Sequence, residues 1–103
     1  MKKFFLNAQT IVNDLCCKLN MEEDVEVLLL TKEEFNTIQQ LDGTYIYLNI
    51  EEICCIYKLQ KVLLHEVVHI ALSKAFPWRV TQNEDIVEAI TEELYKEYFL
   101  DHD

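Results

Sequence analysis

A chain of 103 residues, half of them hydrophobic and with one Gly and one Pro, is predicted to form one compact domain over residues 1–103. The formal net charge of −10 argues against binding to nucleic acid, because phosphates would be repelled and no basic stripe is present. The N-terminal apolar run Phe4-Phe5-Leu6 is too short for a signal peptide or a membrane span, so we expect a cytoplasmic protein without membrane contact.

The spacing of hydrophobic residues predicts the first helix and the first strand. Apolar residues recur at helical intervals over residues 4–19, which predicts an amphipathic first helix. The apolar run Val25–Leu30 predicts a short strand with both faces buried. Thr31 and Glu34 form a capping-box pattern, so a second helix is expected to open there and to continue to about Gln40.

The middle of the chain leads into a long helix. Asp42-Gly43 is a turn signal, and the β-branched and aromatic residues of Thr44–Leu48 predict a second strand. Residues 51–57 are ambiguous between a third short strand and a lead-in to the next helix. The sequence predicts one helix over Lys58–Lys74, with apolar residues along one side, its apolar back. Pro77 cannot continue this helix. The residues expected on that back are Leu59, Leu63, Leu64, Val67, Ile70 and Ala71.

A last helix is expected to run to about Phe99. Its start is marked by a second capping-box pattern, Thr81 with Glu84, and Asn83 is a rival cap. The elements together predict an α+β fold, in which a small β-sheet packs against about four helices. The long helix from Lys58 is expected at the centre of this arrangement.

The central helix carries the motif that points to chemistry, His65-Glu66-Val67-Val68-His69. In this H-E-x-x-H pattern, two imidazoles four residues apart share one helix face and can bind one Zn²⁺ ion. The glutamate between them is then placed to remove a proton from a water molecule. The pattern therefore predicts a zinc site with Glu66 as general base.

A catalytic zinc usually takes three protein ligands, so a third must come from elsewhere. His102 lies at the C-terminus, where chains fray, which favours a carboxylate of the last helix. We select Glu88, because the small Ala89 beside it lets the two helices approach closely, and Glu84 and Glu92 are the alternatives. Glu92, one turn beyond Glu88, is expected to accept the remaining N–H of a ligating histidine.

The order of these residues resembles a known family. H-E-x-x-H, then Glu88-Ala89 nineteen residues after His69, then Glu92, is similar to the gluzincin zinc metallopeptidases, of which thermolysin is one. In its small size, in the strand Tyr45–Leu48 that runs into Asn49, and in the run Val62-Leu63-Leu64 before His65, the chain resembles bacterial and phage metallopeptidases of the ImmA/IrrE-like kind. The resemblance implies a minimal zincin-like domain and an intracellular peptidase that acts on a peptide or protein substrate.

Several alternatives stay open at this stage. The donor that stabilises a tetrahedral oxyanion is not selected by the sequence; the candidates are Tyr57, Arg79, Tyr95, Tyr98 and His102. A rival function is a catalytically inactive metallopeptidase-like scaffold that binds a protein partner. A third interpretation is a structural domain in which the histidines pair with glutamates and bind no metal. The oligomeric state is likewise open.

Four cysteines form two adjacent pairs, Cys16-Cys17 and Cys54-Cys55. Neither pair has the two-residue gap of a zinc knuckle or a redox motif. We expect buried free thiols in a reducing compartment, although a disulfide between the pairs is compatible with the sequence.

Overall fold

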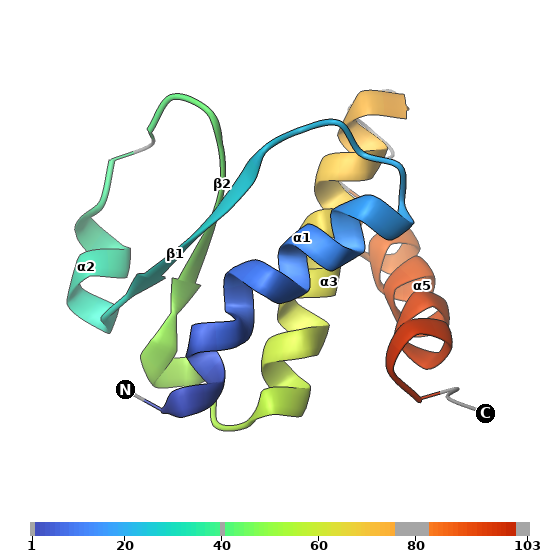
Figure 1. The fold of residues 1–103 in the computed structure, drawn as a ribbon. Helices are drawn as coiled ribbons and strands as arrows, with labels where there is room; N and C mark the ends of the chain where they lie inside the picture. The colour runs from blue at the N-terminus through green and yellow to red at the C-terminus, as the bar shows by residue number, and fades with distance from the viewer. Residues whose placement is uncertain (1, 40, 76–82, 101–103) are drawn as a thin grey trace.

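The computed structural model describes residues 2–39, 41–75 and 83–100. It shows a two-stranded sheet beside a group of helices, which confirms the α+β class (Figure 1). Three features predicted from the sequence lie outside the described residues: the helix break at Pro77, the cap at Thr81 and the position of His102.

The two predicted strands are present and run parallel. β1 (Val25–Leu30) pairs with β2 (Thr44–Asn49), with Val25 opposite Thr44 and Leu30 opposite Asn49. Parallel strands need a crossover of about a dozen residues, and α2 (Lys32–Thr37) lies within it. The expectation that β1 is buried on both faces is wrong, because a two-stranded sheet has few neighbours to cover its second face. Within β1 only Val25 is fully buried.

The start of α2 is set by local chemistry. The backbone N–H of Glu34 donates to Thr31 Oγ1 at 3.2 Å, and the backbone N–H of Thr31 donates to Glu34 Oε1 at 2.9 Å. This reciprocal pair confirms the capping box. The helix ends at Thr37 and none of its residues is buried, so it is shorter than the sequence pattern predicted.

The N-terminal helix covers the outer edge of the sheet. A 3₁₀ turn (Lys3–Asn7) precedes α1 (Ala8–Lys18), so the predicted helix is present with a tighter first turn. The Gln9 side chain acts as a substitute strand: its Nε2 donates to Val25 O at 2.8 Å, and its Oε1 accepts from Val27 N at 2.9 Å. Gln9 therefore satisfies two backbone groups on this edge of β1, at Val25 and Val27.

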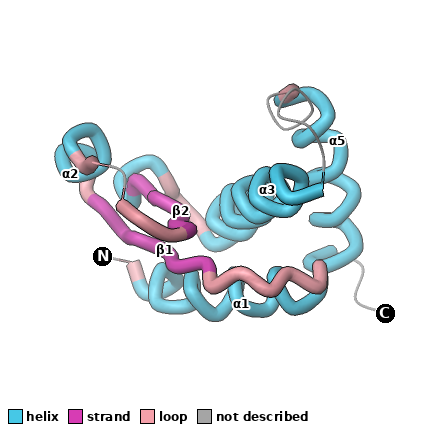
Figure 2. Tube along the Cα trace, turned by 90° about the horizontal axis from the view of Figure 1, so that it is seen from above, coloured by secondary structure: helices cyan, strands magenta, loops and turns pink. Residues whose placement is uncertain are grey.

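The long helix α3 (Ile56–Ala75) occupies the centre, between the sheet and α5 (Glu84–Tyr95), with α1 across it (Figure 2). A 3₁₀ turn (Ile50–Glu52) precedes α3, so residues 51–57 form a lead-in to the helix and not a strand. The fully buried residues of α3 are Leu59, Leu63, Leu64, Val67 and Val68. This apolar back faces the core, which leaves the opposite side of α3 for the histidines.

The last helix extends beyond α5 as a π-helical turn (Lys96–Leu100), in agreement with the predicted end near Phe99. Val87, Thr91 and Tyr95 bury one face of α5 in the same core as α3. No helix in the described ranges has both the length and the apolar character needed to cross a bilayer.

The cysteines are free, but the expectation that all are buried is wrong. Cys16 is buried in α1, Cys55 is half-buried, and Cys17 and Cys54 are exposed. Burial raises the pKa of the Cys16 thiol, and the nearby Glu23 carboxylate adds to that effect. The backbone N–H of Lys58 has the opposite effect on Cys55: it donates to the sulfur at the start of α3 and lowers the pKa of that thiol.

These opposite shifts predict an order of thiol reactivity. A lowered pKa increases the thiolate fraction of Cys55 near neutral pH, and a raised pKa decreases that of Cys16. Iodoacetamide is therefore expected to alkylate Cys55 several times faster than exposed Cys17, with Cys16 slowest. Peptide mapping by mass spectrometry during a time course at pH 7 measures the rates. The Cys55→Ser variant shows how fast the adjacent Cys54 is alkylated by itself. Equal alkylation rates of Cys17 and Cys55 would contradict the predicted order.

Candidate metal centre

Helices α3 and α5 are joined by a ladder of four polar contacts on their facing sides. Three of them follow one another along the helices: Lys61 Nζ to Glu92 Oε1 at 2.5 Å, His65 Nδ1 to Glu88 Oε1 at 2.7 Å, and His69 Nε2 to Glu84 Oε1 at 3.0 Å. The fourth joins His65 Nε2 to Glu84 Oε2. The residue numbers rise along α3 and fall along α5, so the two helices are antiparallel. The four-residue spacing places the three side chains of each helix on one face of that helix.

The first turn of α5 presents Glu84 to the histidines. Asn83 caps the helix, and its Oδ1 accepts from the backbone N–H groups of Asp85 at 3.1 Å and Ile86 at 3.3 Å. Asn83, the alternative cap considered from the sequence, is therefore the N-cap of this helix. Glu84 is the first residue of α5, where the positive end of the helix dipole stabilises a carboxylate.

His65, His69 and Glu84 form a group that could hold a metal ion, with one ligand atom of each lying within 4.8 Å of the others. Glu84 Oε2 is 3.2 Å from His65 Nε2, and Glu84 Oε1 is 3.0 Å from His69 Nε2. A tetrahedral zinc with ligands at about 2.0–2.1 Å keeps neighbouring ligand atoms about 3.3 Å apart. The donor types suit a metal ion, and both contacts with Glu84 are close to this spacing, each through a different carboxylate oxygen.

The other ring nitrogen of His65 is buried and faces α5. Nδ1 lies 2.7 Å from Glu88 Oε1, but off the line of a hydrogen bond, so it has no hydrogen-bond partner among the described residues. A ligating histidine commonly donates its second N–H to such a carboxylate, which fixes the tautomer.

The structure thus differs by one helical turn from the assignment made on sequence. Glu84, and not Glu88, belongs to the compact group with both histidines. Glu88, and not Glu92, lies against the second nitrogen of His65. Glu92 instead accepts a hydrogen bond from Lys61, and this contact raises the pKa of the Lys61 ammonium. The identity of the third ligand stays a prediction, now with Glu84 favoured by proximity.

Glu66 lies beside this group at the wall of an open cavity of about 440 Å³. His65, Glu84 and Glu88 line the same cavity, together with Lys58, Lys61 and Val62. The Glu66 side chain is half-buried and lines the same cavity as His65. A larger hollow of about 680 Å³ beside α1 and β1 has no histidine in its lining and therefore lacks this set of groups.

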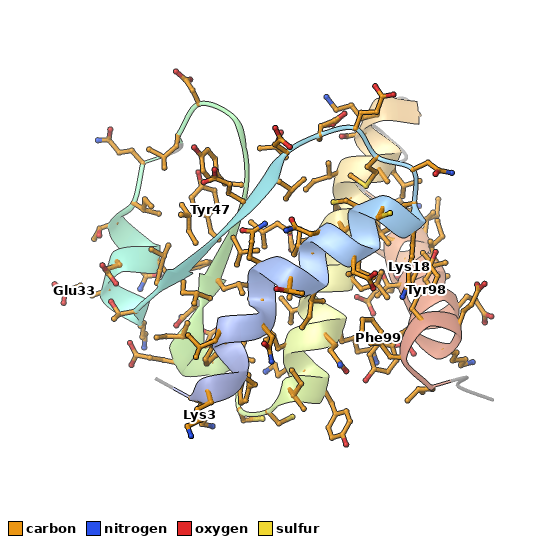
Figure 3. The ribbon with its side chains drawn as sticks, viewed as in Figure 1. Lys3, Lys18, Glu33, Tyr47, Tyr98 and Phe99 are labelled. Carbon is orange, nitrogen blue, oxygen red and sulfur yellow. The ribbon has the colours of Figure 1, made fainter. Side chains whose placement is uncertain are left out.

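Of the oxyanion donors proposed from the sequence, the three tyrosines do not line this cavity. Tyr95 is buried, with Lys61 Nζ 5.7 Å from its ring centroid, and Tyr57 is 66% exposed. Tyr98 packs against α1, where Lys18 Nζ lies 5.0 Å from the ring centroid (Figure 3). The remaining candidates, Arg79 and His102, lie outside the described residues.

The cations that do line the cavity are Lys58 and Lys61. Sequence reasoning missed both lysines. Lys61 lies one helical turn before His65, and Lys58 lies two turns before Glu66, so the helical periodicity of α3 was the signal that could have found them.

No family model, curated protein or solved structure matches the chain. The resemblance to gluzincin metallopeptidases therefore rests on the motif residues alone and stays a prediction.

Proposed function

We propose that this protein is a zinc-dependent metallopeptidase. One zinc ion would be held by His65, His69 and Glu84, with Glu66 as general base and Glu88 orienting His65. The observation that carries the proposal is the convergence of the two imidazoles and the Glu84 carboxylate beside an open cavity that Glu66 also lines. Two nitrogens and one carboxylate are a common ligand set of catalytic zinc, and the open side leaves room for water and substrate.

Each residue has a defined role in this proposal. When bound, a zinc ion supplies a Lewis acid that polarises the scissile carbonyl and lowers the pKa of water. Glu66 accepts a proton from the attacking water and then donates it to the leaving amine nitrogen. Glu88 would accept a hydrogen bond from the Nδ1–H of His65, which would leave the Nε2 lone pair free for the metal ion.

The ladder between α3 and α5 also supports a second candidate function. The contacts of His65 and His69 with glutamates hold the two helices together without an ion. The same residues would therefore serve an inactive scaffold that binds a protein partner. The scaffold needs neither bound zinc nor the Glu66 carboxylate, whereas the peptidase requires both.

Metal content is the first test. Protein purified without chelator is expected to contain one zinc ion per chain by mass spectrometry of its metals. After chelation, zinc added at about 100 times its Kd should raise the free energy of unfolding by about 2.7 kcal/mol. The melting temperature should then rise by roughly 10 °C or more. His65→Ala should lose both effects.

Glu93→Gln is the matched control for that test, because it removes a carboxylate from an exposed position of the same helix α5. It should retain the zinc and the thermal shift. Less than half an equivalent of zinc in the natural chain, with no thermal response, would contradict the peptidase and leave the scaffold.

A further inference from the structure

A second cavity adjoins the candidate metal centre. It has a volume of about 190 Å³ and shares Lys58, Val62 and Glu66 with the first cavity. Because these three residues of α3 line both hollows, the two lie side by side, and together they are called the groove. The apolar part of the second cavity is contributed by Phe35 of α2, Leu48 of β2 and Ile53.

Lys58 is the cation in this groove whose charge is not matched by a carboxylate. Its Nζ donates to the backbone carbonyl of Glu52 at 2.9 Å, and no acidic side chain in the described part of the chain lies within ion-pair distance. Lys61 differs, because its ammonium is held by Glu92. The Lys58 side chain is exposed, and its ammonium has two further N–H donors besides the one used by Glu52.

The rest of the groove disfavours anions. Glu52 and Glu66 line the second cavity, and Glu84 lines the first. A carboxylate on a bound peptide would be repelled at most positions along α3 and attracted only where Lys58 faces it. An acidic group is therefore expected to be accepted at one position, which is a basis for specificity.

The distance along α3 indicates which position this is. Lys58 precedes His65 by seven residues, which at 1.5 Å per residue is about 10 Å along the helix axis. An extended peptide advances about 3.3 Å per residue, so about three residues span that length. The apolar side chains that line the second cavity would contact a residue of such a peptide near Lys58.

We propose that Lys58 is a specificity residue that binds a substrate carboxylate about three residues from the scissile bond. This inference rests on the proposed peptidase function, because the metal centre defines where that bond lies. The carboxylate can belong to an Asp or Glu side chain or to the C-terminus of the peptide. The chemistry at Lys58 is the same for both sources: an ammonium donates charge-assisted hydrogen bonds to a carboxylate.

Peptide hydroxamates provide a direct test, because the hydroxamate binds zinc and fixes the position of the peptide. One pair carries a leucine side chain next to the hydroxamate and ends at the third residue in either a carboxylate or a carboxamide. A second pair ends in an amide and has either Asp or Asn as its third residue. The affinity of the zinc-loaded protein for all four compounds is measured by inhibitor titration or calorimetry.

The natural chain is expected to bind the carboxylate member of at least one pair about five- to tenfold more tightly, since Lys58 is exposed and its contact is weakened by solvent. A preference in the first pair alone assigns the site to C-terminal carboxylates, and a preference in the second pair assigns it to acidic side chains. Lys58→Met should abolish the preference and Lys58→Glu should reverse it.

Lys74→Met is the matched control. It removes the same charge from the same helix, at a residue that lines neither cavity of the groove, and it should keep the preference. Equal affinity for both members of each pair would overturn the role of Lys58 while leaving the peptidase in place. If none of the four compounds binds the zinc-treated protein, the proposed function fails and this inference fails with it.

Discussion

Glu66→Gln is expected to lower the rate of peptide-bond hydrolysis by about 100-fold or more while one zinc ion stays bound. Glutamine keeps the size of the side chain but cannot accept the proton of the attacking water. Glu66 is not part of the compact group formed by His65, His69 and Glu84, so metal affinity should change little. Cleavage of a quenched fluorescent peptide library by the zinc-loaded protein measures the rate, and metal analysis of the same sample measures the zinc.

The same variant separates the two candidate functions. Glu93→Gln makes an identical chemical change on an exposed part of α5 and should leave the rate unchanged. A peptidase whose rate is unaffected by Glu66→Gln would contradict the role of Glu66 as general base. If the natural chain and Glu66→Gln are both inactive toward every peptide but act equally in the cell, the scaffold function is supported.

The parts of the fold that depend on neighbouring residues could be predicted from the sequence. The capping box of Thr31 and Glu34 involves residues three apart, and the two strands were located within one residue of their observed ends. The substitute strand formed by Gln9 could not be predicted, because it joins residues that are distant in sequence. The prediction that both faces of β1 are buried was wrong for the same reason, because residues near β1 in the sequence do not determine how many strands lie beside it.

The candidate site shows the same division between local and long-range features. His65, Glu66 and His69 share one helical segment, so their spacing alone was sufficient to nominate them. Glu84, Glu88 and Glu92 repeat every four residues on one face of α5, and helical periodicity cannot say which of them meets a given histidine. That register depends on contacts between helices, among them the pairing of Lys61 with Glu92. A choice made from periodicity alone can therefore differ from the observed contact by one helical turn.

Glu84→Gln is expected to weaken zinc binding by more than 100-fold, and Glu88→Gln by about 10- to 100-fold. Removing a ligand deletes a bond to the metal, whereas removing the carboxylate at Nδ1 of His65 only loosens the orientation and basicity of one ligand. Glutamine preserves the length of both side chains and leaves the Asn83 cap intact. The order of the two effects therefore reports which carboxylate binds the metal.

Competition between the protein and a chromophoric zinc chelator measures the two affinities. Glu92→Gln serves as the third member of the series: Glu92 pairs with Lys61 and is outside the compact group, so its effect should be the smallest. If Glu88→Gln weakens binding more than Glu84→Gln, the ligand is the residue first selected from the sequence. Because Glu88 now faces Nδ1 of His65, binding through Glu88 would require the His65 ring to turn or the two helices to move relative to each other.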